Sequence, residues 1–265
     1  MPSGIDITFG FDILNWMRSA VVIPARYGST RLEAKPLKDI LGKPMLQWVY
    51  EAARGASLVD MAVVATDDNR IFSAVEAFGG MAVMTSTEHK SGTDRVAEAA
   101  RNIDADIIVN LQGDEPLMKP HMLDAAIRPM LDDPSINICT LKTEICDLKE
   151  YNDPNAVKVV TDKHGYALYF SRSPIPFARV SFEDAGIKPY KHIGLYVFRK
   201  DFLLSFTGLQ QTPLEKAECL EQLRALENGF KIKVVEVDYN PVSVDTAEDL
   251  ERVKGILKRE AGGKA

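Results

Sequence analysis

The sequence has few cysteines, no excess of positive charge and no long apolar run, and each of these excludes a class of protein. Its three cysteines, Cys139, Cys146 and Cys219, form no Cys-x-x-Cys pair, so neither a disulfide framework nor a thiolate zinc site is expected. The formal net charge of −6 and the pI near 5.4 argue against non-specific binding of nucleic acid, which usually requires a basic protein. Thiols without a pairing pattern favour a reducing, cytoplasmic location.

The first 18 residues are the part of the chain least typical of a folded domain. They are fairly apolar, but Asp6, Asp12 and Asn15 interrupt them and no positively charged segment precedes them. They are therefore too short and too polar to span a membrane, and they lack the pattern of a secretory signal peptide. We expect an N-terminal extension over residues 1–18 and a single domain over residues 19–265, with no membrane partner.

Apolar runs of strand length alternate with helical patterns through the first half of the chain. The run at 106–111 is almost purely apolar, which suits a strand that is buried on both faces of a parallel sheet. Regular alternation of strand and helix predicts an α/β fold with a doubly wound, mostly parallel sheet. The strands are expected at 20–25, 61–66, 81–84, 106–111 and 137–141, and the helices at 45–56, 69–78, 92–102 and 120–131.

The pattern becomes irregular after Thr143. Two alternating segments, 156–161 and 167–170, flank a Lys-His-Gly turn, which indicates a β-hairpin. We therefore expect an inserted subregion at about 144–199, an antiparallel embellishment placed over or beside the parallel sheet and available for a dimer contact. Beyond Thr143 the helices are expected at 201–207, 215–228 and 246–259, and the longer strands at 191–199 and 232–237.

The stretch 21–44 joins an apolar run to a glycine-containing basic loop. Arg26, Arg31 and Lys35 follow the run at spacings of five and four residues, and a helical pattern starts after the loop. Loop amides, a helix N-terminus and side-chain cations are what α/β proteins use to hold a polyphosphate. The loop is neither a P-loop nor a dinucleotide fingerprint, because its Gly-Lys pair precedes a proline and Gly28 stands alone. By residue type alone, an ordinary solvated loop fits equally well.

Acidic side chains follow two other predicted strands. Asp114 lies in Gln-Gly-Asp-Glu-Pro directly after the most apolar strand, and Asp245 precedes the last helix. Ligands of an open parallel sheet bind beyond the carboxyl ends of its strands, and Mg²⁺ takes one or two carboxylates plus phosphate oxygens. Asp245 by itself would be read as a helix cap. The turn at Asp114, in contrast, has no evident structural need for two carboxylates. The turn 91–95 either caps a helix or lets a nucleobase or ribose approach the backbone.

Seven segments of the chain together carry a family resemblance. In order, they are IPARYGSTRL with the following KPL, SGTDR, NLQGDEP, SRSPIPF, HIGLYVFR, ECLEQLRALENG and VDTAEDL. In this order and spacing they resemble the 3-deoxy-manno-octulosonate cytidylyltransferases, also called CMP-Kdo synthetases, from about Ala20 to about Arg259. Where that family usually reads RLPGKPL, this chain has Glu33-Ala34 in place of Pro-Gly, which keeps the two cations in register but changes the turn residues.

The resemblance implies a nucleotidyltransferase with a Rossmann-like domain. Its reaction would join CTP to 3-deoxy-D-manno-octulosonate (Kdo) with Mg²⁺, giving CMP-Kdo and pyrophosphate for lipopolysaccharide biosynthesis, in a cytoplasmic homodimer that binds no nucleic acid. By this likeness the catalytic residues would be Lys35, Arg31, Asp114 and Asp245, of which the two aspartates hold the metal. The nucleotide would be bound by Ala25, Arg26, Arg31, Lys35, Ser91, Thr93, Asp94 and Gln112. The sugar would be bound by Gln112, Arg172, His192, Tyr196, Glu221 and Gln222.

Residue chemistry leaves several of these assignments open. His192 and Tyr196 lie four apart in a predicted strand and share one face, where a histidine is more often structural than functional. Another acidic sugar, such as a sialic acid or an amino-substituted octulosonate, is an alternative substrate. A sugar-1-phosphate nucleotidyltransferase fits the basic loop less well, and a catalytically silent nucleotide-binding protein is the alternative of another class.

Overall fold

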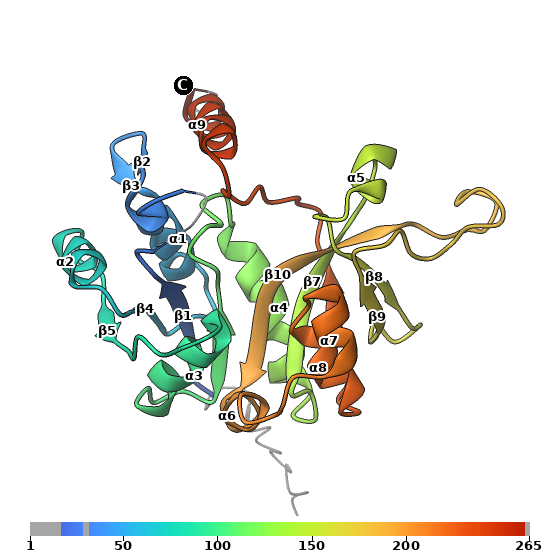
Figure 1. The fold of residues 1–265 in the computed structure, drawn as a ribbon, viewed down its shortest axis with the longest axis horizontal. Helices are drawn as coiled ribbons and strands as arrows, with labels where there is room; N and C mark the ends of the chain where they lie inside the picture. Colours follow the sequence, from blue (N-terminus) through green and yellow to red (C-terminus); the bar gives the residue numbers. More distant parts are fainter. Residues whose placement is uncertain (1–16, 29–31, 263–265) are drawn as a thin grey trace, which may run out of the picture.

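The computed structural model describes residues 17–28 and 32–262, and the side chains of these residues up to 260. Within these residues the main sheet has the strand order β11-β7-β10-β6-β1-β4-β5 (Figure 1). All of these strands run parallel except β10, which is antiparallel to both neighbours, β6 and β7. Their bounds are β1 Ser19–Ala25, β4 Met61–Thr66, β5 Ala82–Met84, β6 Ile107–Asn110, β7 Ile138–Glu144, β10 Tyr190–Arg199 and β11 Lys233–Glu236. The predicted α/β fold is confirmed.

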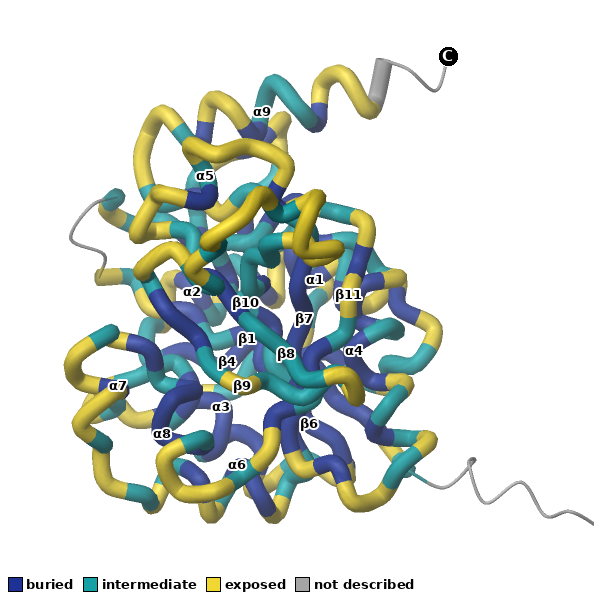
Figure 2. Tube along the Cα trace, turned by 90° about the vertical axis from the view of Figure 1, so that its right-hand side faces the viewer, coloured by how far each residue is buried: buried dark blue, intermediate teal, exposed yellow. Residues whose placement is uncertain are grey.

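Helices cover both faces of this sheet, and strand β1 shows how the sequence encodes it. Val21 and Ile23 belong to one buried apolar cluster, with α1 (Met45–Arg54) and α4 (Pro120–Asp132). Ala20 and Val22 belong to a second buried apolar cluster, with α3 (Gly92–Arg101), α6 (Lys200–Phe206) and α8 (Gln222–Glu227). Successive side chains of a strand point to opposite faces, so an unbroken apolar run places the strand between two layers of helices. Strands β1, β6 and β7 are almost wholly buried, and they are drawn mostly in the buried colour in Figure 2.

Most predicted elements are found, with small shifts at their ends. Besides the strands, α2 (Asn69–Ala77) and α9 (Ala247–Gly262) lie where helices were expected. Four short elements were missed: β2 (Asp39–Ile40) and β3 (Lys43–Pro44), which form a hairpin, the 3₁₀ helix η2 (Lys35–Leu37), and α5 (Leu148–Asn152). Each is too short to show a hydrophobic period. Among the described helices, none combines the length and apolarity needed to cross a bilayer.

The single helix predicted at 215–228 is wrong. The chain forms two short helices, α7 (Pro213–Glu218) and α8 (Gln222–Glu227), because Cys219 between them has the left-handed conformation with φ 51°. The break turns the chain so that Leu220 and Leu223 both reach the apolar cluster shared with α3 and α6. Burial of the two leucines therefore overrides the helical pattern of the sequence.

The region at 144–199 is partly the expected embellishment and partly the main sheet. β8 (Lys158–Thr161) and β9 (Ala167–Ser171) form the predicted antiparallel hairpin, which meets the main sheet where Lys158 pairs with Lys191. β10, at the end of the region, lies between β7 and β6 and is therefore not an addition beside the sheet. The division into a single domain over 19–265 and an extension over 1–18 stays a prediction. Residues 1–16 of that extension lie outside the described residues.

Candidate functional site

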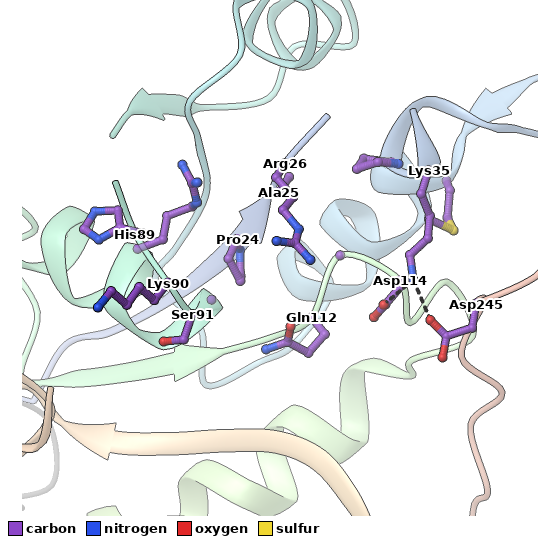
Figure 3. A pocket seen from close by; sticks show the side chains of 15 residues that line it. Pro24, Ala25, Arg26, Lys35, His89, Lys90, Ser91, Gln112, Asp114 and Asp245 are labelled. Carbon is purple, nitrogen blue, oxygen red and sulfur yellow. Dashed lines mark hydrogen bonds and ion pairs between the residues drawn. The ribbon is translucent and has the colours of Figure 1, made fainter. Parts of the chain in front are cut away.

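A cavity of about 280 Å³ opens beyond the carboxyl ends of β1 and β6 (Figure 3). Its walls come from the end of β1, from η2, from the start of α3, from the loop after β6 and from the segment before α9. Segments far apart in sequence meet there because the carboxyl ends of parallel strands share one edge of the sheet. The lining residues are Pro24, Ala25, Arg26, Lys35, Pro36, Met45, His89, Lys90, Ser91, Gly92, Arg95, Gln112, Gly113, Asp114 and Asp245.

At one end of the cavity a lysine bridges two aspartates. Lys35 Nζ donates to Asp114 Oδ2 at 2.6 Å and to Asp245 Oδ1 at 3.0 Å (Figure 3). Burial by itself lowers the pKa of Lys35, but the charge of Asp114 and the hydrogen bonds to both carboxylates outweigh it and raise this pKa above its usual value. The two carboxylates therefore converge on one position that already holds a positive charge.

The same pair of carboxylates has the donor chemistry of a Mg²⁺ site. Both offer hard oxygen atoms, and an ammonium group lies between them at hydrogen-bond distance from each. Mg²⁺ typically takes one or two carboxylates together with substrate phosphate oxygens. Asp114 and Asp245 thus fit a Mg²⁺ ion that arrives with a nucleotide triphosphate.

Lys35 reaches this position because of the turn that precedes it. Ala34 has φ 53° and ψ 32°, a left-handed conformation that costs an L-residue roughly 1–2 kcal/mol and that glycine adopts without strain. The amide of Leu37 then closes the turn on the carbonyl of Ala34 at 2.9 Å. The left-handed turn therefore forms with an alanine at a position where glycine would carry no strain.

Glu115 is a buried acid next to the aspartates. Burial raises the pKa of Glu115 to about 8, and the neighbouring charge of Asp114 adds to this effect. Its Oε2 atom is buried and has no hydrogen-bond partner among the residues described. The sequence analysis assigned Asp114 of this acidic turn and gave Glu115 no role.

The predicted nucleotide-binding residues are only partly gathered at the cavity. Ala25, Arg26, Ser91 and Gln112 line it together with Lys35. Thr93 and Asp94 do not line it, and Arg31 lies outside the described residues.

The turn before α3 is a helix cap, which was one of its two predicted interpretations. Ser91 Oγ accepts from the amide of Asp94 at 3.1 Å, and the Asp94 carboxylate accepts from the amide of Ser91 at 3.2 Å, forming a capping box. At Gly92 an added Cβ would contact Pro24 Cγ at 3.4 Å and Gln112 Oε1 at 3.6 Å. The missing side chain therefore keeps this wall of the cavity open.

A chain of hydrogen bonds runs from the cavity to Glu221. Gln112 Nε2 donates to Asn110 Oδ1 at 2.9 Å, Asn110 Nδ2 donates to Thr93 Oγ1 at 3.2 Å, and the Thr93 hydroxyl donates to Glu221 Oε2. Burial raises the pKa of Glu221, although its hydrogen bond from Thr93 and the charge of Arg224 act in the opposite direction. Asn110, which the sequence analysis missed, links residues predicted to bind the nucleotide with one predicted to bind the sugar.

His192 and Tyr196 do share one face of β10. Their ring centroids are 5.3 Å apart, and His192 Nε2 is 2.9 Å from Thr140 Oγ1. Burial lowers the pKa of His192 to about 3, so the imidazole is neutral near pH 7. Burial raises the pKa of Tyr196, and the charge of Glu221 adds to this. Both side chains are therefore uncharged near pH 7, and neither is among the residues that line the cavity.

Arg172 and Gln222 lie away from the cavity. The Arg172 guanidinium donates to the carbonyls of Glu218 at 2.7 Å and Pro154 at 3.0 Å, and Lys158 Nζ donates to the Arg172 carbonyl at 2.6 Å. Gln222 is buried at the start of α8. Arg172 thus ties the hairpin to α7, and neither side chain is among the residues that line the cavity.

Three residues with nitrogen-bearing side chains at the cavity were given no role in the sequence analysis. His89 and Lys90 line it, and Arg95 donates to Asp67 Oδ2 at 2.8 Å and Thr85 Oγ1 at 2.6 Å. For His89 and Lys90 the signal available in the sequence was their place between a predicted strand and a predicted helix, where loop residues meet the same edge of the sheet. Arg95 lies in the first turns of the predicted helix itself.

Comparisons with known proteins identify the family of this chain. The family model described as cytidylyltransferase matches residues 20–232. The 3-deoxy-manno-octulosonate cytidylyltransferase of Geotalea uraniireducens is 56% identical over 251 residues, which are 92% of this chain and 100% of that protein. The corresponding protein of Syntrophotalea carbinolica is 54% identical over 248 residues, 91% of this chain and 99% of that protein.

Solved structures give the same result at the level of the fold. A structure of CMP:2-keto-3-deoxy-manno-octonic acid synthetase complexed with CTP is 45% identical and superposes with a TM-score of 0.87, covering 92% of this chain and 99% of that one. A cytidylyltransferase from Leptospira borgpetersenii, 21% identical with a TM-score of 0.61 over 92% of this chain and 87% of its own, shares the fold. This chain belongs to the 3-deoxy-manno-octulosonate cytidylyltransferase family.

Proposed function

We propose that this protein activates Kdo with CTP, releasing pyrophosphate and forming CMP-Kdo for lipopolysaccharide biosynthesis. The observation that carries the proposal is the meeting of Lys35, Asp114 and Asp245 at one end of the cavity, although Lys35 and Asp245 are 210 residues apart. The choice of Kdo as the sugar follows the names of the relatives, and the related structure complexed with CTP supports the choice of CTP as the nucleotide.

In this proposal Asp114 and Asp245 hold Mg²⁺, which when bound supplies positive charge to the triphosphate. Lys35 adds a fixed charge beside the phosphates, and Arg26 and Arg31 neutralise the rest of the triphosphate. The anomeric 2-hydroxyl oxygen of Kdo bonds to the α-phosphorus of CTP, the bond from that phosphorus to the bridging oxygen breaks, and pyrophosphate leaves as the hydroxyl proton is released. Such a transfer needs positioning and charge neutralisation more than covalent help from the protein.

The sugar is placed on the side of Gln112 that leads to Glu221. His192 and Tyr196 are uncharged there and offer hydrogen bonds to sugar hydroxyls. The Kdo carboxylate calls for a guanidinium, which can bind it with two parallel hydrogen bonds, so Arg172 would have to exchange its carbonyl partners for the ligand. In this proposal Gln222, next to Glu221 in the chain, also binds the sugar.

We further propose that the protein works as a homodimer in the cytoplasm. The region 144–189 exposes large apolar side chains, among them Phe177 at 87% and Leu148 at 71% exposure, and an unshielded apolar surface is typical of a subunit contact. Cys146 and Cys219 are free, exposed thiols, which suits a reducing compartment.

Pyrophosphate release tests the function directly. The purified protein is incubated with CTP and Mg²⁺, with and without Kdo, and the product is identified by mass spectrometry. We expect pyrophosphate only when Kdo is present, together with CMP-Kdo. A sialic acid and an amino-substituted octulosonate form the comparison panel, and faster turnover of either would replace Kdo as the substrate. Absence of pyrophosphate with every acidic sugar would refute the proposed function.

A further inference from the structure

The last helix packs away from the two main apolar clusters of the sheet. α9 stands at the edge of the molecule and follows Asp245 after one intervening residue (Figure 1). It covers a third apolar cluster, and its own residues alternate between buried and exposed along its length (Figure 2). The buried members of this cluster are Ile40, Met45, Leu117, Val244, Leu250, Val253 and Leu257.

We call the pair of carboxylates Asp114 and Asp245 the cation site. The third apolar cluster joins α9 to segments near Asp114. Met45 starts α1 and lines the cavity, and Leu117 lies three residues after Asp114. On the α9 side, Val253 is fully buried and Leu257 is 7% exposed. The apolar face of α9 therefore contacts the same segments that position Asp114.

The start of this helix is one of the attachments of Asp245, besides the ion pair of its carboxylate with Lys35. The segment 237–246 between β11 and α9 has no regular structure. Within it, the amide of Val244 donates to the carbonyl of Asp114 at 2.9 Å. The amide of Asp245 donates to Asp249 Oδ2 at 3.1 Å, and Asp249 belongs to the first turn of α9. The position of the Asp245 carboxylate thus depends on where the start of α9 lies.

We infer that α9 is a clamp for the cation site: docking of Val253 and Leu257 into the third apolar cluster holds Asp245 beside Asp114. Val253 and Leu257 are positioning residues in this inference, since they contact neither substrate nor metal. The inference rests on the proposed function, because it takes Asp245 to act on the Mg²⁺ that accompanies CTP. Coupling between sites is reciprocal, so Mg²⁺ with CTP also stabilises the docked helix.

The test compares two asparagine substitutions at adjacent positions of α9. Val253→Asn places an amide without partners in the apolar cluster and undocks the helix. Arg252→Asn changes an exposed side chain of the same turn and serves as the matched control. We expect Val253→Asn to raise the Mg²⁺ concentration for half-maximal turnover by about tenfold or more, with unchanged CTP binding in EDTA, because a misplaced charge group loses most of its effect. Arg252→Asn should match the wild type in both measurements.

Hydrogen exchange gives a readout that does not depend on turnover. In the wild type, CTP with Mg²⁺ should slow exchange of the α9 amides more than CTP in EDTA does, and Val253→Asn should abolish the difference. Leu257→Ala should act in the same direction, whereas Leu257→Met keeps the side-chain volume and restores the wild-type Mg²⁺ requirement. The midpoint of thermal unfolding is measured for each variant. A midpoint equal to that of the wild type shows that the variant has lost the docking of α9 and not the fold.

The outcomes separate the inference from the proposed function. If the wild type makes no CMP-Kdo, the proposed function fails, while the exchange experiment still reports on α9. If product forms but Val253→Asn exchanges freely in α9 with a Mg²⁺ requirement within twofold of the wild type, the clamp is refuted. Slow exchange of α9 in Val253→Asn would also refute it, because docking would then not depend on the third apolar cluster.

Discussion

Replacing Asp114 by asparagine is the sharpest test of the cation site. The substitution keeps the shape of the side chain and removes the charge that lies 2.6 Å from Lys35 Nζ. Loss of one preorganised charge stabiliser typically lowers turnover by about 10²–10³-fold, or about 2.7–4 kcal/mol of transition-state stabilisation. The Asp114 side chain is 31% exposed, so solvent screens part of its field and we expect the lower end, about 10²-fold.

The assay is pyrophosphate release at saturating CTP and Kdo, measured over a series of Mg²⁺ concentrations. Turnover should fall and the Mg²⁺ requirement should rise together, since Asp245 is left to hold the cation without its partner. Asp201→Asn, an exposed aspartate of α6, is the matched control and should behave as the wild type. Turnover of Asp114→Asn within threefold of the wild type, at an unchanged Mg²⁺ requirement, would refute the assignment of this carboxylate to the metal.

Three further substitutions test other parts of the site. Ala34→Gly should stabilise the protein by about 1 kcal/mol, because φ 53° strains alanine and not glycine; chemical denaturation measures it, and a loss of stability would contradict the strained turn. His192 has a pKa of about 3 when folded and about 6.5 when unfolded, so the unfolded chain alone takes up a proton between these values and stability falls as the pH drops below about 6.5. Between pH 7 and pH 5 the free energy of unfolding, measured in urea, should fall by about 2 kcal/mol more in the wild type than in His192→Gln. Equal decreases would count against a buried neutral imidazole. Thr93→Val removes the hydroxyl between Glu221 and Asn110 and should lower the free energy of unfolding by about 1–3 kcal/mol. Thr93→Ser keeps the hydrogen bonds and is the control. Equal stabilities of the two variants would show that this chain of hydrogen bonds contributes nothing to stability.

The sequence by itself determined the elements whose signal is local. The apolar run of β1 and the strand 61–66 could be identified because a short unbroken apolar run is typical of a strand buried on both faces. The side chains that follow β1 and β6, such as Lys35 and Asp114, could be placed at one edge because strand direction in a parallel sheet decides where loops emerge.

Only the tertiary structure decided which of the distant segments lie side by side. The place of β10 between β7 and β6, the helix break at Cys219 and the role of Asn110 each depend on a partner far along the chain. No local period records such a partner, because packing of apolar faces and satisfaction of buried polar groups are properties of the assembled fold. For the same reason Asp245 reads as a helix cap in the sequence, and becomes part of a cation site where the folded chain carries it to Lys35.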